Sequence, residues 1–76
     1  MNRETFERIV REKTELSERV KKLADFLVSD KALDISKAQE ILLVRQLNVM
    51  KEYLDILEVR VELEQLLEIE GWVNKD

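Results

Sequence analysis

Cysteine, histidine and proline are all missing from the 76-residue sequence, and glycine occurs only once. Without cysteine, the chain has neither a disulfide framework nor a thiolate metal site to support a small core. Without histidine, it lacks the commonest general base and the commonest metal ligand. The lack of proline and the single glycine favour long helices with short connections. These absences argue against an enzyme, and we expect no cofactor and no bound metal.

Long apolar runs are also absent. No run approaches the roughly 18 residues that cross a membrane, and the first residues do not begin a signal peptide. We therefore expect a soluble protein in the cytoplasm, with no membrane partner. The net charge is −4, and the excess of acidic residues lies after residue 31. Such a chain is a poor candidate for binding a nucleic acid polymer, although a small anion can still bind basic residues in the first third.

The stretch from Ser36 to Glu70 is the longest uninterrupted segment. Ser36 and Gln39 have the spacing of a capping box, which predicts the start of a helix. Gly71 lies where a left-handed residue would end that helix. About 34 residues then form a rod of roughly 50 Å, at 1.5 Å per residue.

Two apolar stripes run along this predicted helix. The first stripe has the a/d spacing of a coiled coil and comprises Leu43, Leu47, Met50, Leu54, Leu57 and Val61. The second stripe lies about a third of a turn away and comprises Leu42, Val49, Tyr53, Ile56, Leu63 and Leu67. A helix that packs against one neighbour needs only one stripe. We therefore expect this helix to be covered from at least two sides, which one short chain cannot do alone.

The sequence predicts an all-α, antiparallel two-helix hairpin as a single domain over residues 1–76. The expected elements are a helix over about 3–28 capped by Asn2, a loop over 29–36, a helix over 37–70 and a tail over 71–76. In the loop, Leu33 and Ile35 are expected to cover the end of the hairpin. If Val28 lies opposite Lys37, the start of the first helix reaches only to about residue 62.

The apolar residues after residue 62 extend beyond the first helix and leave two interpretations of the C-terminal end. In the favoured reading, these residues and the second stripe bind other copies of the chain in an oligomeric helical bundle. In the other, Gly71 turns the tail back onto the hairpin and Trp72 serves as a plug.

Basic residues on the first helix have a simple interpretation and a functional one. In the simple one they form exposed i,i+4 ion pairs: Glu4–Arg8, Glu7–Arg11, Glu15–Arg19 and Glu18–Lys22. In the functional one they bind phosphates, and aromatic side chains stack on nucleotide bases. The candidates for this binding are Phe6, Tyr53 and Trp72 among the aromatic residues and Arg8, Arg11, Arg19, Lys21, Lys22 and Arg60 among the basic ones.

Three segments carry a resemblance to a known family. They are F-E-R-I-V-R-E-K-T-E-L-S-E-R-V-K-K-L-A-D-F-L (Phe6–Leu27), Q-x-x-L-L (Gln39–Leu43) and Q-L-N-V-M-K-E-Y-L-D-I-L-E-V-R-V (Gln46–Val61). The pattern over residues 5–63 resembles the helical hairpin of small phage proteins, namely the type 2 anti-CBASS protein and the type 1 Thoeris anti-defence protein. The resemblance implies a homo-oligomer, often a hexamer, that acts as a sponge in the host bacterial cytoplasm. Such a sponge encloses cyclic di- or trinucleotides or cyclic ADP-ribose-type signals and breaks no bond.

The resemblance also implies roles for individual residues. Phe6 corresponds to the family's base-stacking aromatic, which is usually Tyr, so a hydroxyl is missing here. Lys21 and Lys22 lie at or beside the position of the family's phosphate-binding lysine, and Arg19 corresponds to the basic position before it. Arg60 corresponds to the arginine of the family's second helix, which lies near a second, central site. Two alternatives remain open: a purely structural or protein-binding oligomeric hairpin without a small ligand, and an acidic regulator that binds a basic partner through residues 52–70.

Overall fold

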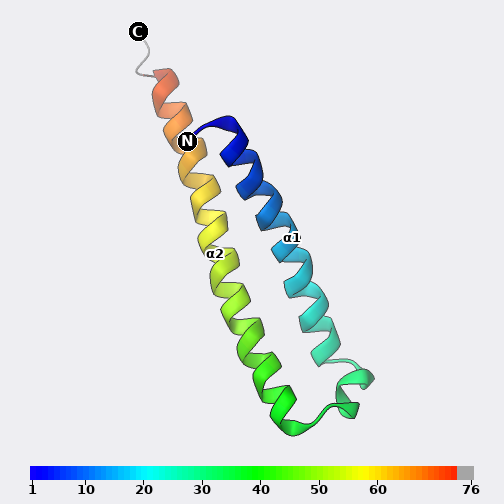
Figure 1. Cartoon of the computed structure of the whole chain (residues 1–76). Helices are drawn as coiled ribbons and strands as arrows, with labels where there is room; N and C mark the ends of the chain where they lie inside the picture. The colour runs from blue at the N-terminus through cyan, green and yellow to red at the C-terminus, as the bar shows by residue number, and fades with distance from the viewer. Residues whose placement is uncertain (74–76) are drawn as a thin grey trace.

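The computed structural model describes the backbone of residues 1–73 and the side chains of residues 1–68. Helix α1 spans Arg3–Leu27, the 3-10 helix η1 spans Asp30–Asp34 and helix α2 spans Lys37–Val73. The two long helices run antiparallel and are joined at one end by η1 (Figure 1). The molecule is a rod with extents of 62 × 16 × 16 Å. The predicted all-α hairpin is confirmed for this part of the chain.

Polar caps define the starts of both long helices. The side chain of Asn2 accepts a hydrogen bond of 2.8 Å from the amide of Thr5, as predicted for the N-cap of α1. At α2, the amide of Gln39 donates to Ser36 Oγ over 3.2 Å. Both bonds satisfy amides that have no partner inside the helix.

The predicted end of α2 is wrong. The helix continues through Gly71 to Val73, so no left-handed turn ends it and the tail does not fold back at that glycine. A glycine inside a helix costs only about 1 kcal/mol relative to alanine, and no proline follows that would stop the helix. The proposed plug, the side chain of Trp72, lies outside the described residues.

The first stripe of α2 faces α1, as predicted. Leu57 is fully buried, and it forms one core cluster with Val61 and with Ile9 and Leu16 of α1. At the same level along the rod, the hydroxyl of Tyr53 donates to Glu12. This contact fits the register in which Val28 lies opposite Lys37.

In the connection between the helices, the predicted burial of Leu33 is wrong. Ile35 is partly buried, but Leu33 is 83% exposed and does not cover the end of the hairpin. The tight turn of η1 places Ala32 and Ile35 in partly buried positions and leaves Leu33 on the outer side. Leu33 therefore adds to the exposed apolar surface of the hairpin instead of covering its end.

The second stripe of α2 is not covered by the described part of the chain, although the hydroxyl of Tyr53 contacts Glu12 of α1. Its six side chains are between 41% and 64% exposed. The accessible surface of the chain is 6444 Å², whereas a compact protein of 9.1 kDa exposes about 4,900 Å². The excess is about 1,500 Å². Residues 1–68 of one chain therefore do not cover both stripes, and the oligomeric bundle stays a prediction.

Candidate functional site

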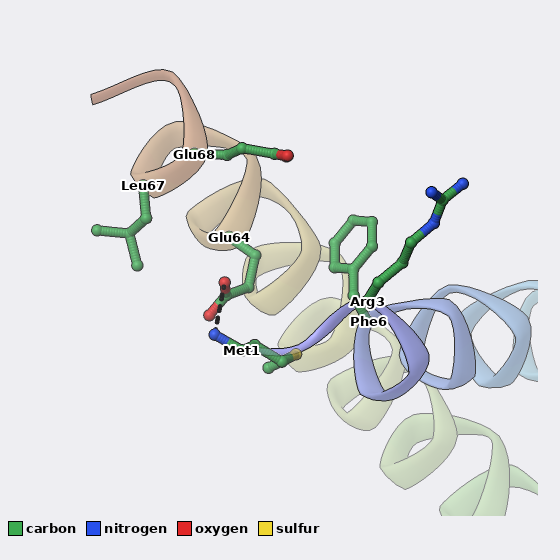
Figure 2. Close-up of a pocket in the computed structure, with 6 residues that line it drawn as sticks. All are labelled: Met1, Arg3, Phe6, Glu64, Leu67 and Glu68. Atoms are coloured by element: carbon green, nitrogen blue, oxygen red, sulfur yellow. Dashed lines mark ion pairs between the residues drawn. The ribbon is translucent and has the colours of Figure 1, made fainter. Parts of the chain in front are cut away.

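The open end of the hairpin holds a shallow groove of about 600 Å³ between the first turn of α1 and the overhanging part of α2. It is lined by Met1, Arg3, Phe6, Glu64, Leu67 and Glu68. Figure 2 shows Phe6 and Arg3 on the α1 side, while Glu64 and Glu68 extend from α2. Phe6 is half-buried and packs against the core cluster, so part of its ring is available to a ligand.

The charges around this groove do not favour a phosphate. Glu64 forms an ion pair of 3.7 Å with the amino group of Met1, and Glu7 forms one of 3.1 Å with the guanidinium of Arg3. Both cations at the groove thus have an acidic partner, and Glu68 adds a further carboxylate to its lining. In a single chain, Phe6 therefore offers a face for stacking but no free cation beside it.

Five basic residues of α1 are exposed and have no ion-pair partner among the described side chains, namely Arg8, Arg11, Arg19, Lys21 and Lys22. The four predicted i,i+4 pairs do not form among residues 1–68, where Glu7 binds Arg3 instead of Arg11. Exposed pairs of this kind contribute at most about 1 kcal/mol, so competing side-chain conformations easily displace them. Arg8, Arg19, Lys21 and Lys22 consequently keep their charges available for an anion from outside the chain.

The candidate residues of α1 are spread along the rod. Lys21 follows Phe6 by fifteen residues of one continuous helix, a separation of about 22 Å. Lys21 and Lys22 also project about 100° apart around the helix axis. One chain therefore does not bring Phe6 together with these two lysines.

Tyr53 and Arg60 share one face of α2, because a spacing of seven residues is close to two helical turns. The hydroxyl of Tyr53 is bound to the carboxylate of Glu12 from α1. This hydrogen bond raises the pKa of Tyr53 above its ordinary value of 10.0, with desolvation and the charge of Glu12 acting in the same direction and Arg60 opposing them. Glu12 was not among the predicted residues, although the register of the hairpin already places residue 12 opposite Tyr53.

Two features are not found among the described residues. No helix among them is long and apolar enough to cross a membrane. No group of three or more Asp, Glu, His or Cys side chains with the arrangement of a metal site occurs in residues 1–68.

These observations define a class: a small helical hairpin that presents basic and apolar surface for contacts with other molecules. The family model described as Sequestin matches residues 3–63, and the chain therefore belongs to the Sequestin family. Sequestins are the phage anti-CBASS and anti-Thoeris cyclic nucleotide sponges, which confirms the family expected from the sequence. Neither a curated protein nor a solved structure matches the chain. Membership supports a sequestering, anti-defence role in a family of sponge-type binding proteins, which are not known enzymes.

Proposed function

We propose that this chain binds and sequesters cyclic nucleotide immune messengers, which are cyclic di- or trinucleotides or cyclic ADP-ribose-type signals. It acts without catalysis, as a phage protein in the cytoplasm of the infected bacterium. Tight binding by an abundant protein lowers the free messenger, so the defence effector that needs this signal stays inactive. The active form is a homo-oligomer, with a hexamer as the expected size.

The observation that carries this proposal is the distance of about 22 Å between Phe6 and Lys21 along α1. A messenger that stacks on one aromatic ring and binds a nearby lysine needs both groups within the length of a nucleotide. Separate chains can supply these groups where a single chain does not. A site formed between copies explains both the incomplete groove at Phe6 and the unpaired lysines near the other end of α1.

The chemistry of each residue suits a different part of the messenger. The exposed part of the Phe6 ring stacks on a base. Arg8 and Arg19 bind phosphate oxygens with two parallel hydrogen bonds, whereas Lys21 and Lys22 act as mobile point charges. Tyr53 and Arg60 belong to a second site near the middle of α2, where the arginine binds phosphate and the ring provides stacking area.

The experiment is a melting curve of the protein with a panel of cyclic di- and trinucleotides and cyclic ADP-ribose isomers. Native mass spectrometry of the same samples gives the size of the oligomer and the number of ligands. A ligand that binds only the folded protein raises its melting temperature. We expect a rise of several degrees for one class of messenger, with the ligand retained on a stable oligomer.

The second candidate function is an oligomeric structural hairpin with no small ligand, and the exposed second stripe favours it equally. The same melting experiment separates the two. An intact oligomer whose melting temperature is unchanged by every messenger in the panel contradicts sequestration and leaves the structural function.

A further inference from the structure

Two cations interrupt the apolar second stripe of α2. Arg60 follows Ile56 by four residues and precedes Leu63 by three, so it lies on the same face of the helix. Arg45 follows Leu42 by three residues and precedes Val49 by four, so it lies on this face as well. Both are exposed, and neither has an ion-pair partner among the described side chains. A surface that is otherwise apolar therefore carries two unpaired positive charges at fixed positions.

One acidic group from α1 lies on the same side of the hairpin. Glu12 accepts a hydrogen bond from the hydroxyl of Tyr53, and Tyr53 belongs to the second stripe. Within one chain, Arg60 is seven residues from Tyr53, or about 10 Å along the helix, and it forms no ion pair with Glu12. The stripe thus presents a positive group and a negative group that are complementary but separated.

The geometry points to a second copy of this chain as the occupant of the second stripe, with the two α2 helices antiparallel about a twofold axis. Arg60 of each copy then lies against the Tyr53–Glu12 pair of the other, and each contact is made twice. The guanidinium has a tyrosine ring for cation–π contact and a carboxylate for a charge-assisted hydrogen bond.

The pairing of Arg60 with Tyr53 determines the position of the axis. In a twofold antiparallel pair, the axis passes midway between the two residues that face each other, which here is between Ile56 and Leu57. The midpoint of α2 is residue 55, so nearly the whole helix is paired. A pairing centred near residue 52 is disfavoured because it brings Arg45 of one copy against Arg60 of the other, and like charges repel.

The exposed area supports a partner of this size. The chain exposes about 1,500 Å² more than a compact protein of its mass. A standard interface removes about 800 Å² from each partner. One such contact along α2 accounts for about half of the excess, which leaves surface for a further copy or for the messenger.

A disulfide test reads the position of the axis directly, because the chain has no cysteine of its own. The variant Ile56→Cys places the two sulfurs close to the axis. The matched control Val49→Cys, on the same stripe and exposed to a similar degree, places them about 22 Å apart along the helix. Mild oxidation with copper phenanthroline should produce a covalent dimer of the Ile56→Cys protein and little or none of the control. Equal cross-linking of both variants, or cross-linking of the control alone, overturns the proposed pairing.

A charge exchange tests the contact between Arg60 and Glu12. In Arg60→Glu chains and in Glu12→Arg chains, each homodimer has like charges at both contacts. In a mixed dimer of the two variants both contacts are opposite in charge again. Native mass spectrometry with one variant isotopically labelled should show at least a tenfold loss of homodimer for each variant alone and its recovery as a 1:1 heterodimer on mixing. Circular dichroism checks that both variants remain helical, and random mixing without preference for the heterodimer contradicts the contact.

This inference rests on the self-association contained in the proposed function, but it does not depend on the messenger. Messenger binding by an oligomer whose Ile56→Cys variant does not cross-link overturns the pairing and leaves sequestration intact. Cross-linking at Ile56 in a protein that binds no messenger supports the pairing and contradicts sequestration. If both hold, a site that contains Tyr53 and Arg60 is built from two chains.

Discussion

The two apolar stripes of α2 have similar composition and opposite environments. On the first stripe, Leu57 packs in the core cluster and is fully buried, whereas Leu63 on the second stripe is 53% exposed to solvent. Both residues are leucines of the same helix, six positions apart. The difference lies in the partner, because α1 of the same chain covers one stripe and nothing in the described chain covers the other. Hydrophobicity alone thus indicates that a surface is covered, but not by which chain.

The largest expected effect comes from the first stripe. Leu57→Ala leaves a cavity in a core that has five buried residues in the described part of the chain, and such substitutions cost about 2–5 kcal/mol. We expect the free energy of unfolding, measured by chemical denaturation, to fall by this amount at every protein concentration. A loss below about 1 kcal/mol contradicts the central position of Leu57.

A similar loss, in binding instead of stability, is expected on the free surface of α1. Lys21→Glu combined with Lys22→Glu removes two charged contacts of at least about 1.5 kcal/mol each, which corresponds to a hundredfold or greater loss of messenger affinity. Calorimetric titration measures this loss, and native mass spectrometry should show an unchanged oligomer. The control is Lys51→Glu, which reverses another exposed lysine on α2. Retained affinity in the double variant places the site elsewhere.

A smaller effect that depends on concentration is expected on the second stripe. Leu63→Ala removes apolar area that is exposed in the single chain and that the proposed pairing buries, at a cost of about 1 kcal/mol per chain. The proposed assembly couples folding to association, so the melting temperature of the unsubstituted protein should rise with protein concentration. Leu63→Ala should weaken this dependence, while Leu57→Ala lowers the whole curve. A melting temperature independent of concentration in all three proteins indicates a stable monomer.

The smallest effect concerns the hydrogen bond that joins the helices at the edge of the second stripe. The protein has one tyrosine, so the increase in absorbance near 295 nm on ionisation of the phenol reports Tyr53 alone, above a constant contribution from the single tryptophan. The pKa of Tyr53 should lie above its ordinary value of 10.0, mainly because the hydroxyl is bonded to Glu12. A raised folded-state pKa stabilises the fold below pH 10, and this contribution disappears as the pH rises through the folded-state value. Glu12→Gln should bring the titration back toward the ordinary value, and an unchanged titration argues against the hydrogen bond.

The hairpin was largely predictable because its signals are local. Apolar periodicity identified both helices, and Asn2 and Ser36 marked their starts through caps that involve only a few neighbouring residues. The end of α2 was not predictable from Gly71, since glycine allows a turn without requiring one. The four predicted ion pairs of α1 do not form, because the free energy that each would contribute is smaller than the conformational entropy that its side chains would lose.

The candidate site was less predictable for a different reason. Glu12 resembles every other exposed glutamate of α1 in the sequence, and only the register of the two helices makes it the partner of Tyr53. The proposed residues Phe6, Lys21 and Lys22 were selected by resemblance and remain a prediction. Their separation along α1 means that the geometry of the site depends on how chains meet, which a single sequence does not encode in local patterns.

The short connection between α1 and α2 also affects how quickly the protein becomes available. Residues near η1 pair across a few positions of the chain, and the later pairs can form in sequence from that end toward Met1. Helical proteins with such local pairing fold in microseconds to milliseconds. For the proposed oligomer, encounter between chains, whose rate depends on concentration, is then expected to be the slow step. The amount of protein synthesised, more than the folding of each chain, should set how soon after synthesis assembly begins.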